Sequence, residues 1–94
     1  MKLGDLCKID VNMTDADFWL RRVGSSRDIG TPHRTIDLDD IGVKVIKTEV
    51  LVPDYLFYVM LHLHQEGVFN KLAVGLSSKT LTIKSISDIP IQQQ

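Results

Sequence analysis

The chain has a single cysteine, Cys7, among its 94 residues. One thiol cannot form an intramolecular disulfide framework or a cysteine metal cluster. We therefore expect Cys7 to be a small buried or half-buried side chain rather than a reactive one. The sequence also lacks any apolar run near the ~20 residues of a membrane span. Its N-terminus lacks the long apolar stretch of a signal peptide, and we expect a cytoplasmic protein.

A surplus of positive charge is also missing, since the net charge is -1. This balance argues against a protein that binds nucleic acid non-specifically through bulk positive charge. The apolar fraction of 44% and the charged fraction of 24% are ordinary for a globular protein. The length predicts one small domain, residues 1–94, with a core of marginal size.

The sequence lacks the spacings that mark catalytic and metal sites. His62 and His64 are two residues apart on a predicted helix, so they point to different sides and are badly placed to share a metal. We expect His62 to face solvent and His64 to pack and form hydrogen bonds. The acidic cluster of Asp37, Asp39 and Asp40 lacks the EF-hand spacing. Neither a G-x-S-x-G motif nor a phosphate-binding loop occurs, so we expect no enzyme, no cofactor and no metal.

The hydrophobic pattern predicts an α+β fold, a small twisted sheet packed on one main helix. Aromatic and β-branched residues and period-two alternation indicate strands. The main helix should begin at a proline, which suits the first helical turn, and end before a glycine. Shorter helical turns are expected at 5–9, with Asp5 as a cap, at 70–74 and at 85–89. The three strands are predicted near 17–23, 41–48 and 80–84, and the main helix at 53–66.

The predicted helix is apolar over most of its circumference. One stripe, at spacings of three and four residues, should face the core. A second apolar stripe beside it should remain after the sheet has covered the first, and exposed patches of that kind usually mark an interface. We expect a homodimer through this second stripe, unless the N-terminal segment folds back to cover it. The core stripe is Leu56, Val59, Met60 and Leu63, and the predicted interface is Phe57, Tyr58 and Leu61.

Positive charge is concentrated in residues 21–34. Four arginines and Asp28 give this segment +3, so the rest of the chain carries -4. The segment is rich in glycine and small hydroxyl residues, which allow a close approach to a duplex. Arginine binds phosphate as a fork or reads guanine in the major groove. In the other interpretation, which stays open, these arginines pair with the following aspartates. The candidate DNA contacts in this first loop are Arg21, Arg22, Ser25, Arg27 and Arg34.

A second loop, residues 75–80, offers hydroxyls and one cation. Ser77, Ser78 and Lys79 are its candidate DNA contacts. A simple turn between a helix and a strand is an equally good interpretation of this loop.

Three phrases, in order, resemble one family. They are Lys-Leu-Gly-Asp at 2–5, Pro-Asp-Tyr-Leu-Phe-Tyr at 53–58 followed by a Gly-Leu-Ser-Ser loop at 75–78, and Ile-Ser-Asp-Ile-Pro-Ile at 86–91. This arrangement resembles the target-recognition domain of type I restriction-modification specificity subunits. The resemblance spans nearly the whole chain but is sparse between residues 10 and 40. It implies a module that binds double-stranded DNA and carries out no chemistry.

The chain departs from that family in lacking a second recognition domain and long spacer helices. The resemblance therefore implies a miniature, single-domain version, of the kind a phage or mobile element carries. It should act as a homodimer or as a subunit of a larger assembly. The alternative function is a protein-interaction module that modulates a restriction-modification or other host complex without reading DNA.

Overall fold

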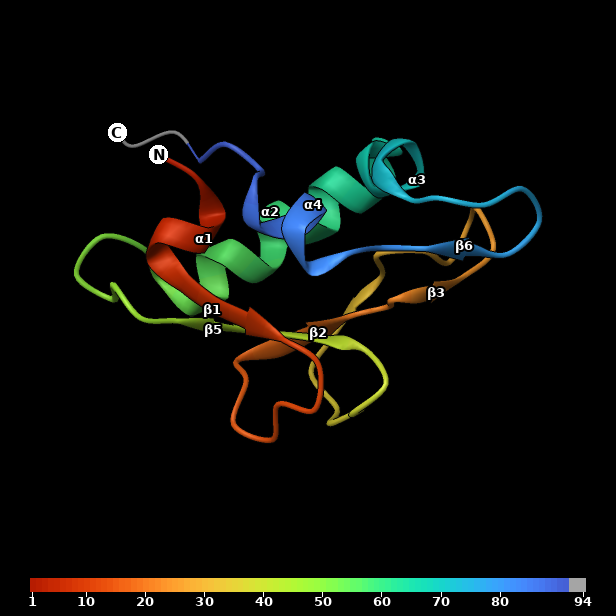
Figure 1. Cartoon of the computed structure of the whole chain (residues 1–94). Helices are drawn as coiled ribbons and strands as arrows, with labels where there is room; N and C mark the ends of the chain where they lie inside the picture. The colour runs from red at the N-terminus through yellow and green to blue at the C-terminus, as the bar shows by residue number, and fades with distance from the viewer. Residues whose placement is uncertain (92–94) are drawn as a thin grey trace.

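The computed structural model describes residues 1–91 (Figure 1). The three glutamines at 92–94, expected from the sequence to fray, lie outside the described residues. The helices are α1 (Leu3–Leu6), α2 (Pro53–Gln65), α3 (Val68–Leu72) and α4 (Ile83–Ser87). The strands are β1 (Cys7–Asp10), β2 (Phe18–Leu20), β3 (Val23–Gly24), β4 (Pro32–His33), β5 (Ile41–Val45) and β6 (Lys79–Thr80).

Four strands form an antiparallel sheet in the order β1-β5-β2-β4, and β3 pairs with β6 in a separate two-stranded sheet. The helices lie on one face of the larger sheet, and the loops at 11–17 and 34–40 lie on the other side (Figure 1). This arrangement confirms the predicted α+β class. Within residues 1–91, no helix is long and apolar enough to cross a membrane.

Strand β5 lies between β1 and β2, and its alternate residues are apolar. Ile41, Val43 and Val45 are all buried, as the period-two pattern predicts. Gly42 points to the opposite face, where a Cβ would lie 2.8 Å from the Cβ of Met13. A side chain at this position would therefore displace the loop that covers that face.

Helix α2 confirms the predicted helix to within one residue at its C-terminal end. Pro53 starts it, and Gly67 follows it with a φ of 76°. Leu56 and Met60 are fully buried, as predicted. Val59 and Leu63 are only half-buried, because this side of the helix faces a groove rather than the sheet.

The predicted helical turn at 5–9 is wrong in position. Helix α1 starts earlier, and the Asp5 carboxylate accepts the backbone N–H of Lys2 (2.9 Å) from the first turn rather than acting as the cap residue. Residues 7–10 are instead strand β1, whose partner is β5 with Cys7 opposite Val45.

Two predicted strands are divided or shortened. The predicted strand 17–23 is split, because the chain leaves the larger sheet after Leu20 and joins the smaller one at Val23. The predicted strand 41–48 ends at Val45.

The predicted strand 80–84 ends after Thr80, since Thr82 caps a helix. The Thr82 Oγ1 accepts the backbone N–H of Ser85 (3.1 Å), and α4 follows directly. Likewise, the predicted helical turn at 70–74 starts two residues early, as α3.

The two ends of the described chain lie side by side (Figure 1). The backbone N–H of Ile91 donates to the carbonyl of Met1 (2.8 Å), and that of Leu3 donates to the carbonyl of Ile89 (2.8 Å). The smaller sheet lies at the opposite end of the molecule from the termini.

Candidate nucleic-acid interface

The two loops with candidate DNA contacts come together in the smaller sheet. Val23 pairs with Thr80 and Gly24 pairs with Lys79, so the loops flank one antiparallel pair. The backbone N–H of Leu81 also donates to the carbonyl of Arg22 (2.8 Å). We call residues 21–31 and 74–81 together the basic ribbon.

The loop between Val74 and Thr80 is a tight hairpin. Val74 and Thr80 exchange two backbone hydrogen bonds, of 3.0 and 2.9 Å. Gly75 has a φ of 128°, and a Cβ there would lie 2.2 Å from the carbonyl oxygen of Ser78. Only glycine fits this position, so the hairpin depends on it.

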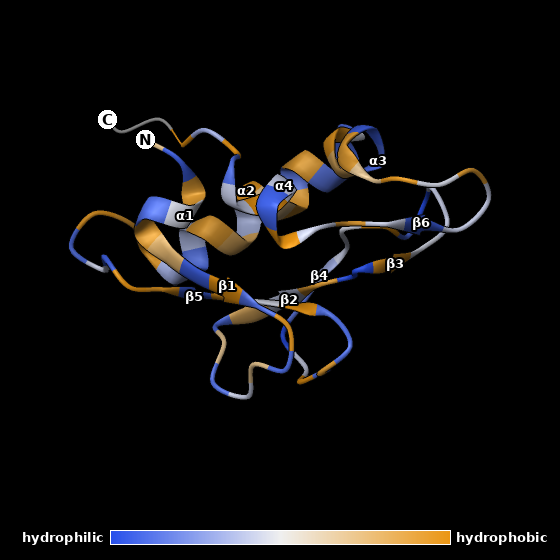
Figure 2. Ribbon diagram, viewed as in Figure 1, coloured by the Kyte–Doolittle hydropathy of each residue, from blue (hydrophilic) through white to orange (hydrophobic). Residues whose placement is uncertain are grey.

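The tip of this hairpin carries an exposed leucine. Leu76 is 98% exposed, more than any other large hydrophobic residue among those described. Figure 2 shows this tip as a hydrophobic segment in an otherwise polar loop. Sequence analysis overlooked Leu76, although one apolar residue between Gly75 and two serines is a readable signal.

The first loop is a turn closed by its own side chains. Its start is closed by Ser25, whose hydroxyl hydrogen bonds to the Asp28 carboxylate (3.2 Å) and whose carbonyl accepts the N–H of Asp28 (3.1 Å). Thr31 closes its end by donating its hydroxyl to the carbonyl of Asp28 (2.5 Å). Arg27 therefore projects from a defined turn.

The base of the first loop is fixed to the helical layer. Ile29 is buried, and Gly30, with a φ of 77°, lies so close to Phe69 that a Cβ would come within 2.3 Å of its ring. His64 forms a hydrogen bond between its Nδ1 and the carbonyl of Ile29 (3.0 Å). The predicted packed role of His64 is confirmed, and it serves to hold the basic ribbon.

Three cations of the ribbon have unpaired side chains. Arg21 and Arg27 are exposed and Lys79 is half-buried. None of these three side chains forms a hydrogen bond or an ion pair with residues 1–91. All three are therefore available to an anion.

Arg22 is held by the acidic segment that follows the loop. Its Nε donates to the carbonyl of Asp39 (2.6 Å), and its backbone N–H donates to the Asp40 carboxylate (3.2 Å). Asp40 is only 5% exposed and also contacts His33 Nε2 (2.7 Å). The Arg22 side chain thus contacts this segment through a backbone carbonyl, and within residues 1–91 it forms no ion pair with the aspartates that were expected to pair with it.

Arg34 lies outside the ribbon, against α2. Its Nη1 contacts the Asp54 carboxylate at 3.3 Å, and its guanidinium carbon lies 4.0 Å from the centroid of the Phe57 ring. The five sequence candidates of the first loop are thus divided. Arg21, Ser25 and Arg27 share the ribbon with the second loop. Arg22 also lies in the ribbon, but its side chain contacts Asp39, and Arg34 lies outside it.

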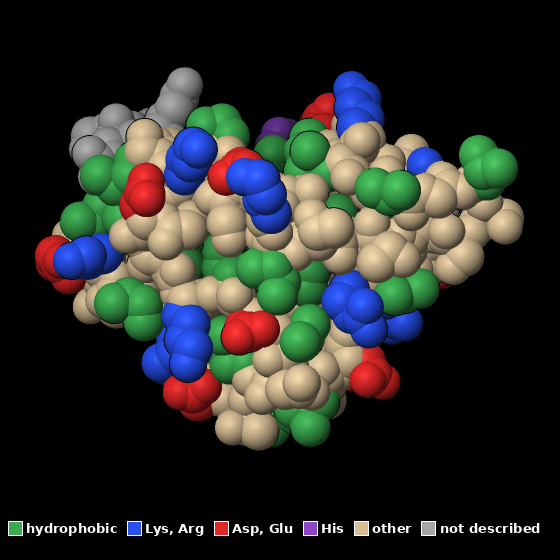
Figure 3. All heavy atoms as spheres, in the orientation of Figure 1, with side chains coloured by type: hydrophobic (Ala, Val, Ile, Leu, Met, Phe, Trp, Pro, Cys, Tyr) green, Lys and Arg blue, Asp and Glu red, His purple; other side chains and the backbone are tan. Residues whose placement is uncertain are grey.

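The ribbon is a positive region in an acidic molecule. Its four cations and Asp28 give +3, four minus one, and the rest of the chain therefore carries -4. Over the left half of the face in Figure 3, basic and acidic side chains alternate, and on the right a basic group lies beside hydrophobic side chains with an acidic group just below it. Ser77 and Ser78 add two exposed hydroxyls next to these charges.

The predicted dimer residues lie in different environments on α2. Phe57 is half-buried, and its ring meets that of Phe18 edge-on at a centroid distance of 5.6 Å. Tyr58 is 62% exposed and Leu61 is half-buried. Tyr55, 60% exposed and three residues before Tyr58, extends this exposed row.

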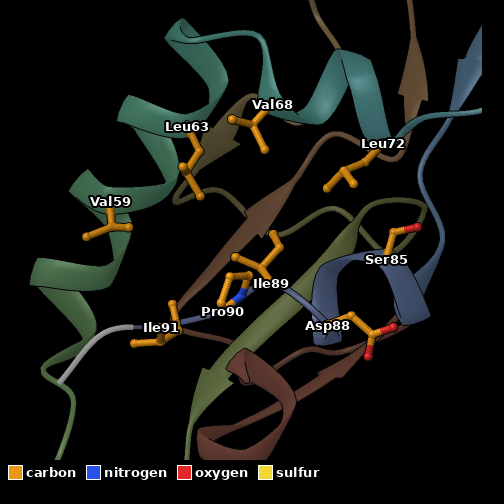
Figure 4. Close-up of a pocket in the computed structure, with 9 residues that line it drawn as sticks. All are labelled: Val59, Leu63, Val68, Leu72, Ser85, Asp88, Ile89, Pro90 and Ile91. Carbon is orange, nitrogen blue, oxygen red and sulfur yellow. The ribbon is translucent and has the colours of Figure 1, made fainter. Parts of the chain in front are cut away.

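An apolar groove lies between α2, α3 and the C-terminal segment (Figure 4). Its volume is about 510 Å³. The polar lining residues are Ser85 and Asp88, and the Asp88 carboxylate is already engaged by Lys84 (3.1 Å) and Lys2 (3.6 Å). Sequence analysis missed this groove because it joins segments far apart in the chain. Its apolar lining is Val59, Leu63, Val68, Leu72, Ile89, Pro90 and Ile91.

Cys7 is buried at the start of β1. Burial, with a smaller contribution from the negative charge of Asp17, raises the pKa of the Cys7 thiol to about 11. This thiol is protonated at neutral pH, in keeping with the expected unreactive role. Residues 1–91 contain no group of three His, Cys, Asp or Glu side chains that could hold a metal ion.

Comparison of the chain with protein-family models, with curated proteins and with solved structures finds no match.

Proposed function

We propose that this protein is a non-catalytic module that binds double-stranded DNA through the basic ribbon. The observation that carries the proposal is the pairing of β3 with β6. That pairing places Arg21, Arg27 and Lys79 on one element while their side chains lack partners within residues 1–91. The resemblance to a restriction-modification target-recognition domain points to the same two loops.

Phosphate contacts would provide most of the affinity. A cation that neutralises a phosphate releases a counterion, so binding weakens as salt rises. Three contacts predict a slope of about -2.7 in log K against log salt concentration. Three phosphate contacts give one copy of the protein only a weak affinity for DNA. The base sequence would be recognised by side chains that reach the edges of the bases.

The test is a titration of a fluorescent duplex at several salt concentrations. Arg27→Ala and Lys79→Ala should each weaken binding and reduce the salt slope by about one unit. Lys47→Ala is the matched control, because it removes the same charge from an exposed position outside the ribbon. An absence of duplex binding by the unmutated protein at low salt would refute the proposal.

A homodimer forms part of the proposal. Two copies related by a two-fold axis would double the phosphate contacts and suit a palindromic site. The exposed row of Tyr55 and Tyr58, with Leu61 beside it, is the surface that we assign to this contact. Phe57 supports the row from behind, since its ring meets that of Tyr58 at a centroid distance of 5.5 Å.

The second candidate function is protein interaction, and the groove beside α2 favours it. Its apolar lining and its already paired Asp88 suit the apolar face of a partner helix. The test is binding to a purified restriction-modification methyltransferase complex. Val59→Asp, in the groove, should abolish binding, and Val50→Asp, an exposed position outside it, should not. Binding unaffected by Val59→Asp would remove this candidate.

A further inference from the structure

Leu76 occupies an unusual position for an apolar side chain. It is 98% exposed at the tip of a hairpin whose ends are closed by two backbone hydrogen bonds. Exposure of a whole leucine side chain to water is unfavourable. The tight turn at Gly75 instead holds it outward, so the position suits a partner that receives it.

The surroundings of Leu76 identify the kind of partner. Its neighbours Gly75, Ser77 and Ser78 are small, so no bulky side chain blocks the approach of the tip. Lys79 follows on β6, and Gly24, its partner on β3, leads into the turn that carries Arg27. An apolar tip with cations behind it is the arrangement used by proteins that bend DNA from the minor groove. Such proteins insert an aliphatic side chain between neighbouring base pairs.

We propose that Leu76 is a wedge that enters the minor groove of DNA and partly unstacks one base step. The inference rests on the proposed DNA-binding function and extends it to the mode of contact. The cations of the ribbon would hold the phosphates on either side of the opened step. Pyrimidine–purine steps such as TA and CA should be preferred, because they are the easiest to unstack and kink.

The test uses a duplex with a dye at each end and 2-aminopurine beside a central TA step. The unmutated protein should bring the dyes closer and raise the 2-aminopurine fluorescence. Leu76→Ser and Leu76→Ala should lose both signals and bind about tenfold more weakly, with an unchanged salt slope. Leu76→Phe, which keeps an apolar wedge, should retain both signals.

The matched control is Ile36→Ser, because Ile36 is 58% exposed in the loop between β4 and β5, outside the ribbon. It should leave binding and bending unchanged.

The outcomes separate this inference from the proposed function. Duplex binding without bending, or bending that survives Leu76→Ser, would overturn the wedge and leave the DNA-binding proposal standing. No duplex binding at low salt would remove both. Loss of self-association in Leu76→Ser, measured by sedimentation without DNA, would assign the leucine to a contact between copies and overturn the wedge.

Discussion

Two glycines with nearly the same backbone conformation have different surroundings. Gly30 and Gly67 have φ values of 77° and 76°. A Cβ at Gly67 would meet nothing within 4 Å, whereas a Cβ at Gly30 would fall within 2.3 Å of the Phe69 ring. We expect Gly67→Ala to lower the free energy of unfolding by about 1 kcal/mol through backbone strain alone. Gly30→Ala should cost at least about twice as much, because it adds a steric clash.

Urea unfolding of the two variants measures this difference. The Gly30→Ala change should also weaken duplex binding, because Gly30 fixes the base of the first loop. Equal losses of stability in the two variants would contradict the packing of Gly30 on Phe69.

The Cys7 thiol gives stability a dependence on alkaline pH. Its pKa rises from an ordinary value of 9.0 to about 11 in the folded protein. The folded state therefore holds this proton more tightly than the unfolded state does. Its contribution to stability is complete below pH 9.0 and is lost as the pH rises towards about 11.

Urea midpoints measured from pH 8 to pH 11 test this dependence. Other groups also titrate in this range, so the informative quantity is the difference between the unmutated protein and Cys7→Ala. That difference should shrink as the pH rises. Parallel profiles for the two proteins would show that the thiol is not desolvated in the folded state.

At the scale of the element, the two sides of α2 should differ in their contribution to stability. Leu56 is fully buried in the core, whereas Leu63 is half-buried at the groove. Leu56→Ala should cost about 2–5 kcal/mol because it leaves a cavity. Leu63→Ala should cost about 1 kcal/mol, since the open groove already admits water.

Chemical denaturation, monitored by far-ultraviolet circular dichroism, measures both effects. A loss at Leu63 as large as that at Leu56 would mean that the groove is closed in solution.

Helix α2 could be predicted from sequence because its signals are local. All of them lie within fifteen consecutive residues, 53–67. They are a proline at the start of the helix, a glycine after its end and an apolar stripe of helical period between the two. The predicted strand 80–84 failed for a local reason as well. The β-branched residues there favour a strand. The Thr82 side chain instead caps helix α4, and this cap outweighs their strand preference.

The basic ribbon could be predicted only in part. Composition identified its two loops, because glycine, serine and arginine gather there. Their pairing joins two strands of two residues each, 55 positions apart between Gly24 and Lys79. Strands so short carry no readable period. Likewise, the side chains of Arg22 and Arg34 are engaged by Asp39 and Asp54, contacts that only the fold brings close.

At the scale of the whole molecule, the proposed dimer can be tested through the exposed row on α2. Tyr58→Glu or Leu61→Glu should shift the protein to monomer in sedimentation at micromolar concentration, because a buried unpaired carboxylate opposes the contact. Ile46→Glu is the control, since Ile46 is 54% exposed and lies outside α2. A strictly monomeric unmutated protein would remove the dimer proposal.

The adjacency of Met1 and Ile91 has a consequence for any chain joined to this molecule. A segment attached before residue 1 and another attached after residue 91 would depart from the same point, which lies opposite the ribbon. Residues 1–91 could therefore be inserted into a surface loop of another protein without separating the ends of that loop. A short linker between the two ends would equally permit a circular permutant, with new termini cut in the exposed stretch at 46–50. In the inserted form, the ribbon would point away from the carrier protein, so several such modules on a common support could present their ribbons to the same ligand.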